Sequence, residues 1–456
     1  MPKKKTALTI EERLQQALVP AEEQPYEVPE NWVWVRLGEV NKYTSKSVNP
    51  ISEPDKTFEL YSVPSMADNY PEIIVGSDIG SSKQSVCKGD VLLCKINPRI
   101  NRVWKVSQFT DNELIASSEW IIIRNNHIDA NYLMYCFQSK YFREFMLSNV
   151  SGVGGSLMRA QPKYVQTYPI PLPPLSEQQR IVERIEELFA KLDEAKERLQ
   201  EAADSFAVRK AAILHKAFTG ELTKQWRREN GVSDESWEEK KLGEVCFVNP
   251  RKIDAKNLDG DLEVSFIPMA AVSDVLGEIV NPEVKNLEDV RTGFTNFAEG
   301  DVIFAKITPC MENGKSAVVG PLVNDIGYGS TEFYVLRCKE ELYNKYVYHM
   351  VRNTTFRAEA KAVMTGAVGQ QRVPKTFLQE YQLSLPTLPE QYEIVRLIDD
   401  LLARERKAQQ AAEQALASIE LMKKSILARA FRGELGTNKA SEASALELLR
   451  LLEFQP

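Results

Sequence analysis

Two long stretches of the chain, residues 172–223 and 385–436, space their apolar residues alternately by three and by four. This heptad spacing is typical of helices that pair lengthwise, so we predict one long helix in each stretch. Heptad order over so many turns disfavours the alternative, in which two helices pack separately within one core. The predicted pairing seam consists of Ile181, Ile185, Leu188, Leu192, Leu199 and Phe206 in the first helix, and of Ile394, Ile398, Leu401, Ile419, Met422 and Ile426 in the second.

The ends of the first helix carry sequence signals. Ser176 has a glutamine three residues later, which is the spacing of a capping box, and it follows a proline-rich lead-in. Gly220 stands just past the last apolar position, where a C-terminal glycine is favoured. In the second copy, Glu405 interrupts the seam at the position where the first copy has Leu192.

The two stretches are copies of one another. LPPLSEQQRIVERIEELF at 172–189 returns as LPTLPEQYEIVRLIDDLL at 385–402, and KAAILHKAFTGEL returns as KKSILARAFRGEL, with one constant offset and no gap. Weaker matches precede each copy: GDVLLCKINP corresponds to GDVIFAKITP, and SSEWIIIR corresponds to STEFYVLR. The chain is therefore a variable globular domain followed by a near-constant helix, and this unit occurs twice.

The globular segments show short β-rich runs between turn residues, together with two helical patterns. We predict strands at 90–96, 120–124, 301–307 and 333–337, and helices at 131–147 and 344–360. The predicted fold class is α+β: two mixed α/β domains separated by two long helices, related as a pseudo-two-fold tandem repeat.

Connectivity predicts the direction of the helices. The second helix begins at the second domain, so it pairs with the first most simply by running back, antiparallel. About 40 residues per helix would make a rod of about 60 Å between the domains. We expect the tail to pack near the first domain or residues 9–18. The predicted segments are an N-terminal extension (1–30), a first globular domain (31–171), the first helix (172–223), a linker (224–236), a second globular domain (237–384), the second helix (385–436) and a C-terminal tail (437–456).

The net charge of the chain bears on how it could bind DNA. The 456 residues carry 57 Lys and Arg against 64 Asp and Glu, a net charge of −7. A free-standing duplex-DNA binder is usually basic, because phosphate contacts dominate affinity. The chain therefore either does not bind DNA or shares the phosphate contacts with partners. No stretch approaches the roughly 18 apolar residues of a membrane span, and the start lacks the apolar run of a secretory signal. We expect a cytoplasmic protein without membrane contact.

Motifs for catalysis are missing from the sequence. It has no NPPY- or DPPY-type loop of an amino-methyltransferase, no P-loop and no GxSxG. The six cysteines form no CxxC pair and the three histidines are scattered, so we predict no metal site. These features favour a binding protein over an enzyme.

The repeated lead-ins LPPLSEQ and LPTLPEQ and the repeated ends ILHKAFTGEL and ILARAFRGEL strongly resemble the specificity (S) subunit of type I restriction-modification systems. The resemblance covers nearly the whole chain. Two features depart from the family pattern: an extension precedes Trp32, and Pro389 replaces the serine of the first lead-in, although proline is tolerated in a first helical turn.

The resemblance implies that each variable domain is a target recognition domain that reads one half of a bipartite double-stranded DNA sequence, and that the helices set the gap between the halves. It implies two methyltransferase subunits that bind the helical region and methylate adenine with S-adenosylmethionine, while this chain binds no cofactor. Motor-nuclease subunits would join where the system also cuts unmodified DNA. The alternatives are a stand-alone DNA methyltransferase and a coiled-coil scaffold without DNA specificity.

Two segments of each domain are candidates for DNA contact. One is a basic run with an interleaved Trp104, whose alternative is a solvated hairpin face; the other is a glycine-containing loop, whose alternative is an ordinary loop. Arginine can pair with guanine and glutamine with adenine. The candidates are Lys95, Arg99, Arg102 and Lys105, with Lys306, Asn313 and Lys315 in the related run, and Arg159, Gln161 and Lys163, with Gln370, Gln371, Arg372 and Lys375 in the related loop.

Overall fold

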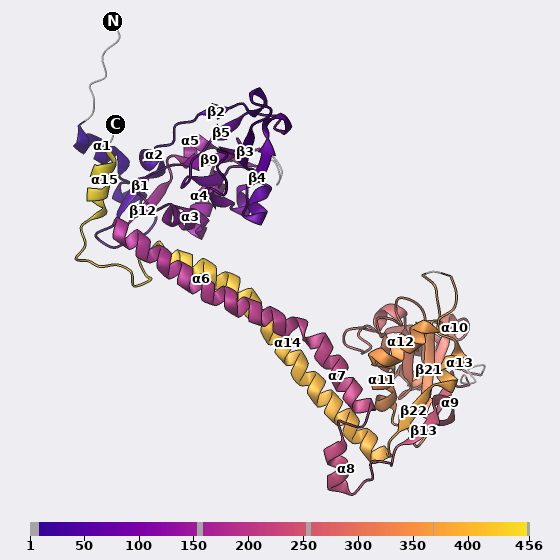
Figure 1. Cartoon of the computed structure of the whole chain (residues 1–456). Coiled ribbons are helices and arrows are strands. Elements are labelled where there is room, and N and C mark those ends of the chain that lie inside the picture. The colour runs from indigo at the N-terminus through magenta and orange to yellow at the C-terminus, as the bar shows by residue number, and fades with distance from the viewer. Residues whose placement is uncertain (1–8, 153–157, 252–256, 368, 454–456) are drawn as a thin grey trace. The chain divides into compact units, whose positions relative to one another are not determined.

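The computed structural model describes residues 9–152, 158–251, 257–367 and 369–453. It divides into two compact units, one made of residues 1–199 and 414–456 and the other of residues 200–413. The boundary crosses both long helical stretches. Each unit therefore contains one globular domain and a portion of each stretch (Figure 1).

The globular domain of the first unit contains two main sheets. A five-stranded sheet has the order β2-β5-β8-β3-β4, in which β3 and β8 are parallel, and a three-stranded sheet has the order β7-β6-β9. Strand β1 pairs with β12, so the start and end of the domain lie side by side. The strands are β1 (Val33–Arg36), β2 (Ser47–Val48), β3 (Thr57–Tyr61), β4 (Glu72–Val75), β5 (Lys83–Ser85), β6 (Val91–Cys94), β7 (Val103–Lys105), β8 (Glu113–Ala116), β9 (Trp120–Ile123), β10 (Val150–Ser151), β11 (Arg159–Ala160) and β12 (Pro169–Leu172).

Both faces of the three-stranded sheet are buried. One face packs Leu92, Trp104 and Trp120 against Tyr61 of β3, and the other contributes to the core formed with the helices. Trp104 is 5% exposed and donates from Nε1 to Asn69. The tryptophan that the sequence places within a basic run is thus a core residue. The helices of this domain are α1 (Ile10–Ala17), α2 (Leu37–Val40), α3 (Ala130–Gln138), α4 (Lys140–Ser148) and α5 (Pro162–Val165).

The second unit repeats this plan. Its four-stranded sheet has the order β14-β21-β18-β19, its second sheet has the order β16-β15-β20-β17 with β15 and β20 parallel, and β13 pairs with β22. The strands are β13 (Glu238–Lys241), β14 (Cys246–Val248), β15 (Glu263–Ile267), β16 (Glu283–Asn286), β17 (Thr295–Phe297), β18 (Val302–Ala305), β19 (Ser316–Val318), β20 (Gly327–Gly329), β21 (Phe333–Cys338) and β22 (Gln382–Leu385). The helices of this unit are α7 (Phe206–Phe218), α8 (Lys224–Asn230), α9 (Leu242–Val245), α10 (Leu287–Val290), α11 (Asn344–Arg352), α12 (Thr354–Ala362) and α13 (Lys375–Glu380).

The four predicted strands are confirmed as β6, β9, β18 and β21, whereas each predicted helix of the globular domains is two helices. The break between α3 and α4 falls at Ser139, whose hydroxyl accepts from the backbone N–H of Phe142. The break between α11 and α12 falls at Asn353, whose side chain accepts from Thr355 N. Serine and asparagine at these positions start a new helix because they satisfy the free N–H groups of its first turn.

The long helices are α6 (Leu175–Asp204) and α14 (Leu388–Ala430). The first predicted helix is interrupted at Ser205, after which α7 begins. Helix α6 begins at Leu175, so Ser176 lies inside the first turn and the predicted cap at that residue is wrong.

Cross-helix ion pairs show that the helical stretches run antiparallel. In the first unit, Lys423 lies 2.5 Å from Asp193 and Lys196 lies 3.1 Å from Glu420. In the second unit, Glu405 accepts from Arg209 at 2.8 Å, which gives the acid that interrupts the apolar seam a partner on the facing helix.

The predicted seam residues differ in burial. Ile181, Ile185, Ile394 and Ile398 are fully buried where the helices meet the globular domains, and Phe206 and Ile419 are also buried. Leu188, Leu192, Leu199, Leu401 and Ile426 are partly buried, whereas Met422 is half exposed.

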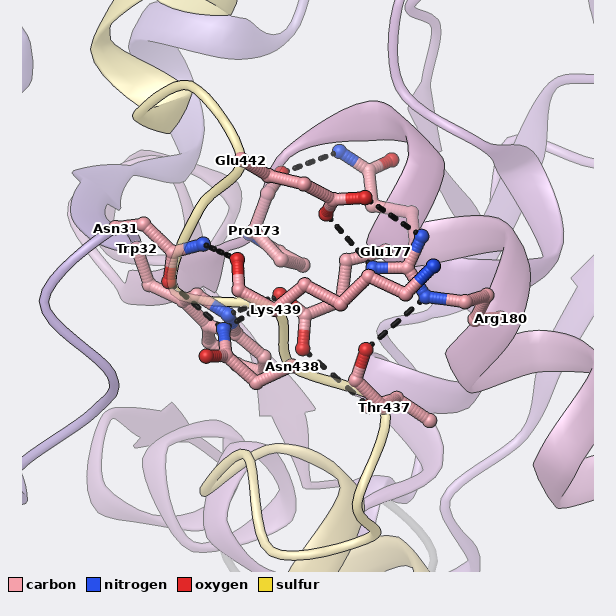
Figure 2. Close-up of polar contacts among 10 residues, drawn as sticks. Asn31, Trp32, Pro173, Glu177, Arg180, Thr437, Asn438, Lys439 and Glu442 are labelled. Carbon is pink, nitrogen blue, oxygen red and sulfur yellow. Dashed lines mark hydrogen bonds and ion pairs between the residues drawn. The ribbon is translucent and has the colours of Figure 1, made fainter.

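The C-terminal tail packs on the first globular domain and on α1, as expected from the sequence. Helix α15 (Ala445–Glu453) lies beside α1, and Ala445, Leu448 and Leu449 join the core there. Ahead of α15, the side chain of Asn438 donates to the buried carboxylate of Glu177 at 2.8 Å, and Trp32 Nε1 donates to the same carboxylate at 2.8 Å (Figure 2).

Glu390 plays the corresponding part in the second unit. Its Oε1 accepts from Thr223 Oγ1 and from Arg227 Nη1, both at 2.7 Å. Each unit therefore uses a buried glutamate in the first turn of its long helix to hold the segment that follows the other helix.

Candidate nucleic-acid interface

Three segments of the second unit bring Lys306, Glu332 and Arg372 together. Lys306 follows the end of β18, and Glu332 precedes the start of β21. The loop with Arg372 joins them through a bridge from Ile307 to Arg372 and a backbone hydrogen bond from Val373 N to Lys306 O of 2.9 Å. The cluster is thus positioned by the ends of two central strands.

Within this cluster, Arg372 forms a two-pronged ion pair. Its Nε and Nη2 donate to the two carboxylate oxygens of Glu332 at 2.9 and 2.8 Å, and Nη1 donates to Gln370 O at 3.0 Å. The Arg372 hydrogen bond lowers the pKa of Glu332. Burial lowers the pKa of Lys306. The arginine side chain remains 43% exposed, so its guanidinium is oriented by Glu332 and open to solvent on one side.

The first unit contains the same cluster in Lys95, Glu119 and Arg159. Ile96 bridges to Arg159, Ala160 N donates to Lys95 O at 2.8 Å, and Lys95 N donates to Glu119 O at 3.0 Å. Arg159 faces Glu119 at 3.4 and 3.5 Å, a longer contact than in the second unit. The repeat has therefore kept a lysine, a glutamate and an arginine in one arrangement while the surrounding sequence diverged.

This arrangement suits contact with nucleic acid. An arginine whose fork is held in place loses less side-chain freedom when it binds, and it can take guanine O6 and N7 or a phosphate. A carboxylate beside it can accept from cytosine N4. Glu119 and Glu332 are not among the contact residues predicted from the sequence, which are all cations and amides. The signal was present, since the matched runs SSEW and STEF hold the same acid in both copies.

The other predicted contact residues are divided between two kinds of position. Lys105 and Lys315 are engaged within the fold: Lys105 Nζ donates to Asn131 at 2.6 Å, and Lys315 Nζ donates to Met269 O at 3.1 Å. Lys105 also pairs with Val91 at the end of β7 away from Lys95. The exposed or half-exposed candidates are Arg99, Arg102, Gln161, Lys163, Asn313, Gln370, Gln371 and Lys375. Residues 153–157 and Val368 of the glycine-containing loops lie outside the described residues.

The residues that the structure describes offer no candidate metal site and no candidate membrane span. No group of three or more His, Cys, Asp or Glu side chains there could hold a metal ion. No helix in that part of the chain is long and apolar enough to cross a membrane.

A duplicated α/β domain with a long helix after each copy, and with the same Lys–Glu–Arg cluster in both copies, defines a tandem-repeat protein with one candidate binding surface in each copy. Residues 29–203 and 234–414 match the type I restriction modification DNA specificity domain. The chain belongs to this family, as the repeated helix motifs predict.

Curated relatives agree with the family. The chain is 31% identical over 261 residues to the type I restriction enzyme EcoEI specificity subunit of Escherichia coli, and 36% identical over 187 residues to the EcoAI specificity subunit of the same organism. These matches cover 48% and 41% of this chain, but only 43% and 31% of the two relatives. The chain thus spans less than half the length of each.

Solved structures show the same fold. The crystal structure of the HsdS subunit from Thermoanaerobacter tengcongensis aligns with a TM-score of 0.66 at 22% identity, over 90% of this chain and 99% of that one. The predicted fold class, two mixed α/β domains with two long antiparallel helices in a tandem repeat, is confirmed.

Proposed function

We propose that this chain is the DNA sequence-recognition subunit of a type I restriction-modification complex. Each globular domain reads one half of a bipartite target, and the paired helices set the spacer and bind the methyltransferase subunits. The observation that carries the proposal is the recurrence of one cluster, Lys95–Glu119–Arg159 and Lys306–Glu332–Arg372, in both repeats of a chain of this family.

The chemistry is assigned to partner chains. Two methyltransferase subunits would bind S-adenosylmethionine and methylate adenine, and this chain would bind no cofactor. Motor-nuclease subunits would join where the system also cuts DNA. The net charge of −7 supports this division, because a chain with excess acid depends on partners for much of the phosphate contact.

A binding experiment tests this division of labour. The purified chain, with and without a methyltransferase subunit, is titrated against duplex DNA that carries the methylated sequence of the host, and against scrambled DNA. We expect weak binding without sequence preference from the chain alone, and tight, specific binding once the methyltransferase is added. Equal specific affinity in both cases would contradict the proposal.

The same preparations separate the two rival functions. Transfer of labelled methyl groups to DNA by the chain alone would identify a stand-alone methyltransferase. A reconstituted complex that protects no defined sequence would identify a scaffold without DNA specificity.

A further inference from the structure

A pocket of about 770 Å³ lies in the second unit, between the long helices and the globular domain. Lys210 on α7 and Arg406 on α14 line one side of it. Tyr348 and Arg352 on α11 line another, and residues 275–284 form part of the rim. The cluster of Lys306, Glu332 and Arg372 contributes no residue to the pocket.

The two units differ in charge at two matched positions of their long helices. Under the offset that aligns Leu172 with Leu385, Lys210 corresponds to Lys423 and Arg406 corresponds to Asp193. Lys423 and Asp193 form an ion pair of 2.5 Å across the helices. In the second unit, the same two positions hold two cations.

These cations lack a carboxylate. Among the described residues, neither Lys210 nor Arg406 has an ion-pair partner, although both line the same pocket. Burial lowers the pKa of Lys210, and the nearby positive charges of Arg352, Arg357 and Arg406 lower it further. Arg352 adds a further positive charge, since its guanidinium donates to the neutral backbone oxygens of Gly314 and Asp274. An anion between Lys210 and Arg406 would replace the carboxylate that the first unit supplies from its own helix.

Part of the rim of the pocket is apolar and exposed. The exposed fractions of Val275, Leu276 and Val284 are 77%, 38% and 54%. A neighbouring group of large apolar residues open to water marks a surface that another molecule covers. A small ion inside the pocket would leave Val275 exposed to water. The occupant therefore has to be larger than the space between Lys210 and Arg406.

We propose that this pocket is the docking site of a partner polypeptide, which places a carboxylate between Lys210 and Arg406 and aliphatic side chains on Val275, Leu276 and Val284. Duplex DNA fits poorly, because its row of phosphates would meet Glu278, Glu283 and Asp399 of the lining, whereas a single carboxylate needs only the space between Lys210 and Arg406. DNA also has little to place on an aliphatic rim.

This inference goes beyond the proposed function, in which each repeat unit plays the same part. The first unit closes the corresponding positions with its own Asp193–Lys423 pair. It also packs Tyr135 against Phe189, with ring centroids 5.9 Å apart. The partner therefore docks once per chain and makes the assembly asymmetric.

A site-specific cross-link tests the proposal in the full chain. The photoreactive amino acid p-benzoylphenylalanine replaces Val275, and the chain is irradiated in the cells that encode it. Mass spectrometry then identifies the linked peptide. We expect one partner segment with Asp or Glu between aliphatic residues.

The matched variants are Arg406→Asp and Arg404→Glu. Arg406→Asp reproduces the charge arrangement of the first unit, so the chain should fold. The binding site for the partner's carboxylate should be lost. The cross-link should fall about tenfold or more, because a desolvated charge pair at an interface is costly to break. Arg404 is on the same helix, 76% exposed and outside the pocket lining, so Arg404→Glu should leave the yield unchanged.

Other outcomes overturn the proposal. These are a cross-link to DNA, to a second copy of this chain or to a segment without a carboxylate, an equal yield from Arg406→Asp, or no cross-link at all. The methylated sequence of the host is mapped in the same cells. Loss of a defined bipartite target with the cross-link intact would instead contradict the proposed function.

Discussion

Arg159 and Arg372 hold the same place in the two repeat units, and each faces a glutamate that directly precedes a strand, β9 or β21. The carboxylate restricts the guanidinium without burying it. Such a side chain can read a base edge with little loss of freedom on binding. The shorter contact in the second unit makes Arg372 the better test of this idea.

Replacing Arg372 by alanine should weaken reading of the second half-site only. The expected cost is about 1–3 kcal/mol if the guanidinium contacts a base. The measurement is the affinity of the reconstituted complex for duplexes with substitutions in one half at a time. A uniform loss for all sequences, with a shallower salt dependence, would place Arg372 on phosphate instead.

The matched control for this prediction is Arg291→Ala. Arg291 is exposed in the same unit and lies outside the cluster. The Arg291→Ala variant should leave the affinity for both half-sites unchanged. If Arg372→Ala behaves like this control, Arg372 is not part of the interface.

At this scale the sequence predicted residue types and segments, and the contact of any of these cations with DNA stays a prediction. Arg159 and Arg372 could be proposed from the sequence, because residue type and loop position both favoured them. The contacts of Lys105 and Trp104 within the fold could not be predicted, since their hydrogen-bond partners, Asn131 and Asn69, come from distant segments. Contact partners depend on how three segments meet, and spacing along one segment does not encode this.

At the scale of elements, the tail helix α15 completes the core of the first unit. Leu449 is 2% exposed and packs with residues of the N-terminal segment and the globular domain. Because α1 and α15 pack together here, the stability of the first unit depends on residues from both helices.

Replacing Leu449 by alanine should destabilise the first unit by about 2–5 kcal/mol, the usual cost of a cavity at a buried leucine. Leu451→Ala is the control, because Leu451 is on the same helix and 59% exposed. The readout is hydrogen exchange of first-unit amides, in which only Leu449→Ala should lose protection. Equal protection in both variants would show that α15 does not support the core.

The long helices were the elements that the sequence predicted best, because a heptad seam is a repeating signal that local divergence cannot hide. The break at Ser205 was not predicted, since no glycine or proline marks it. The breaks at Ser139 and Asn353 carried a signal in their capping side chains, and the apolar periodicity across them obscured it.

At the scale of the whole molecule, the helices are proposed to set the spacer between half-sites. Adding one heptad to each helix at equivalent seam positions preserves the packing register. It lengthens the pair by about 10 Å, which corresponds to about three base pairs. The spacer mapped from methylated sites should lengthen accordingly. An unchanged spacer in a stable, active variant would show that the helices connect the subunits without setting the spacer.

The central claim is that two independent readers share one chain, and exchange of a single domain tests it most directly. Residues 31–171 are replaced by the equivalent domain of another family member, and methylated adenines are mapped across the genome of cells that carry the exchanged chain and its methyltransferase. We predict a new first half-site, an unchanged second half-site and an unchanged spacer. A target altered in both halves, or altered in neither, would contradict it.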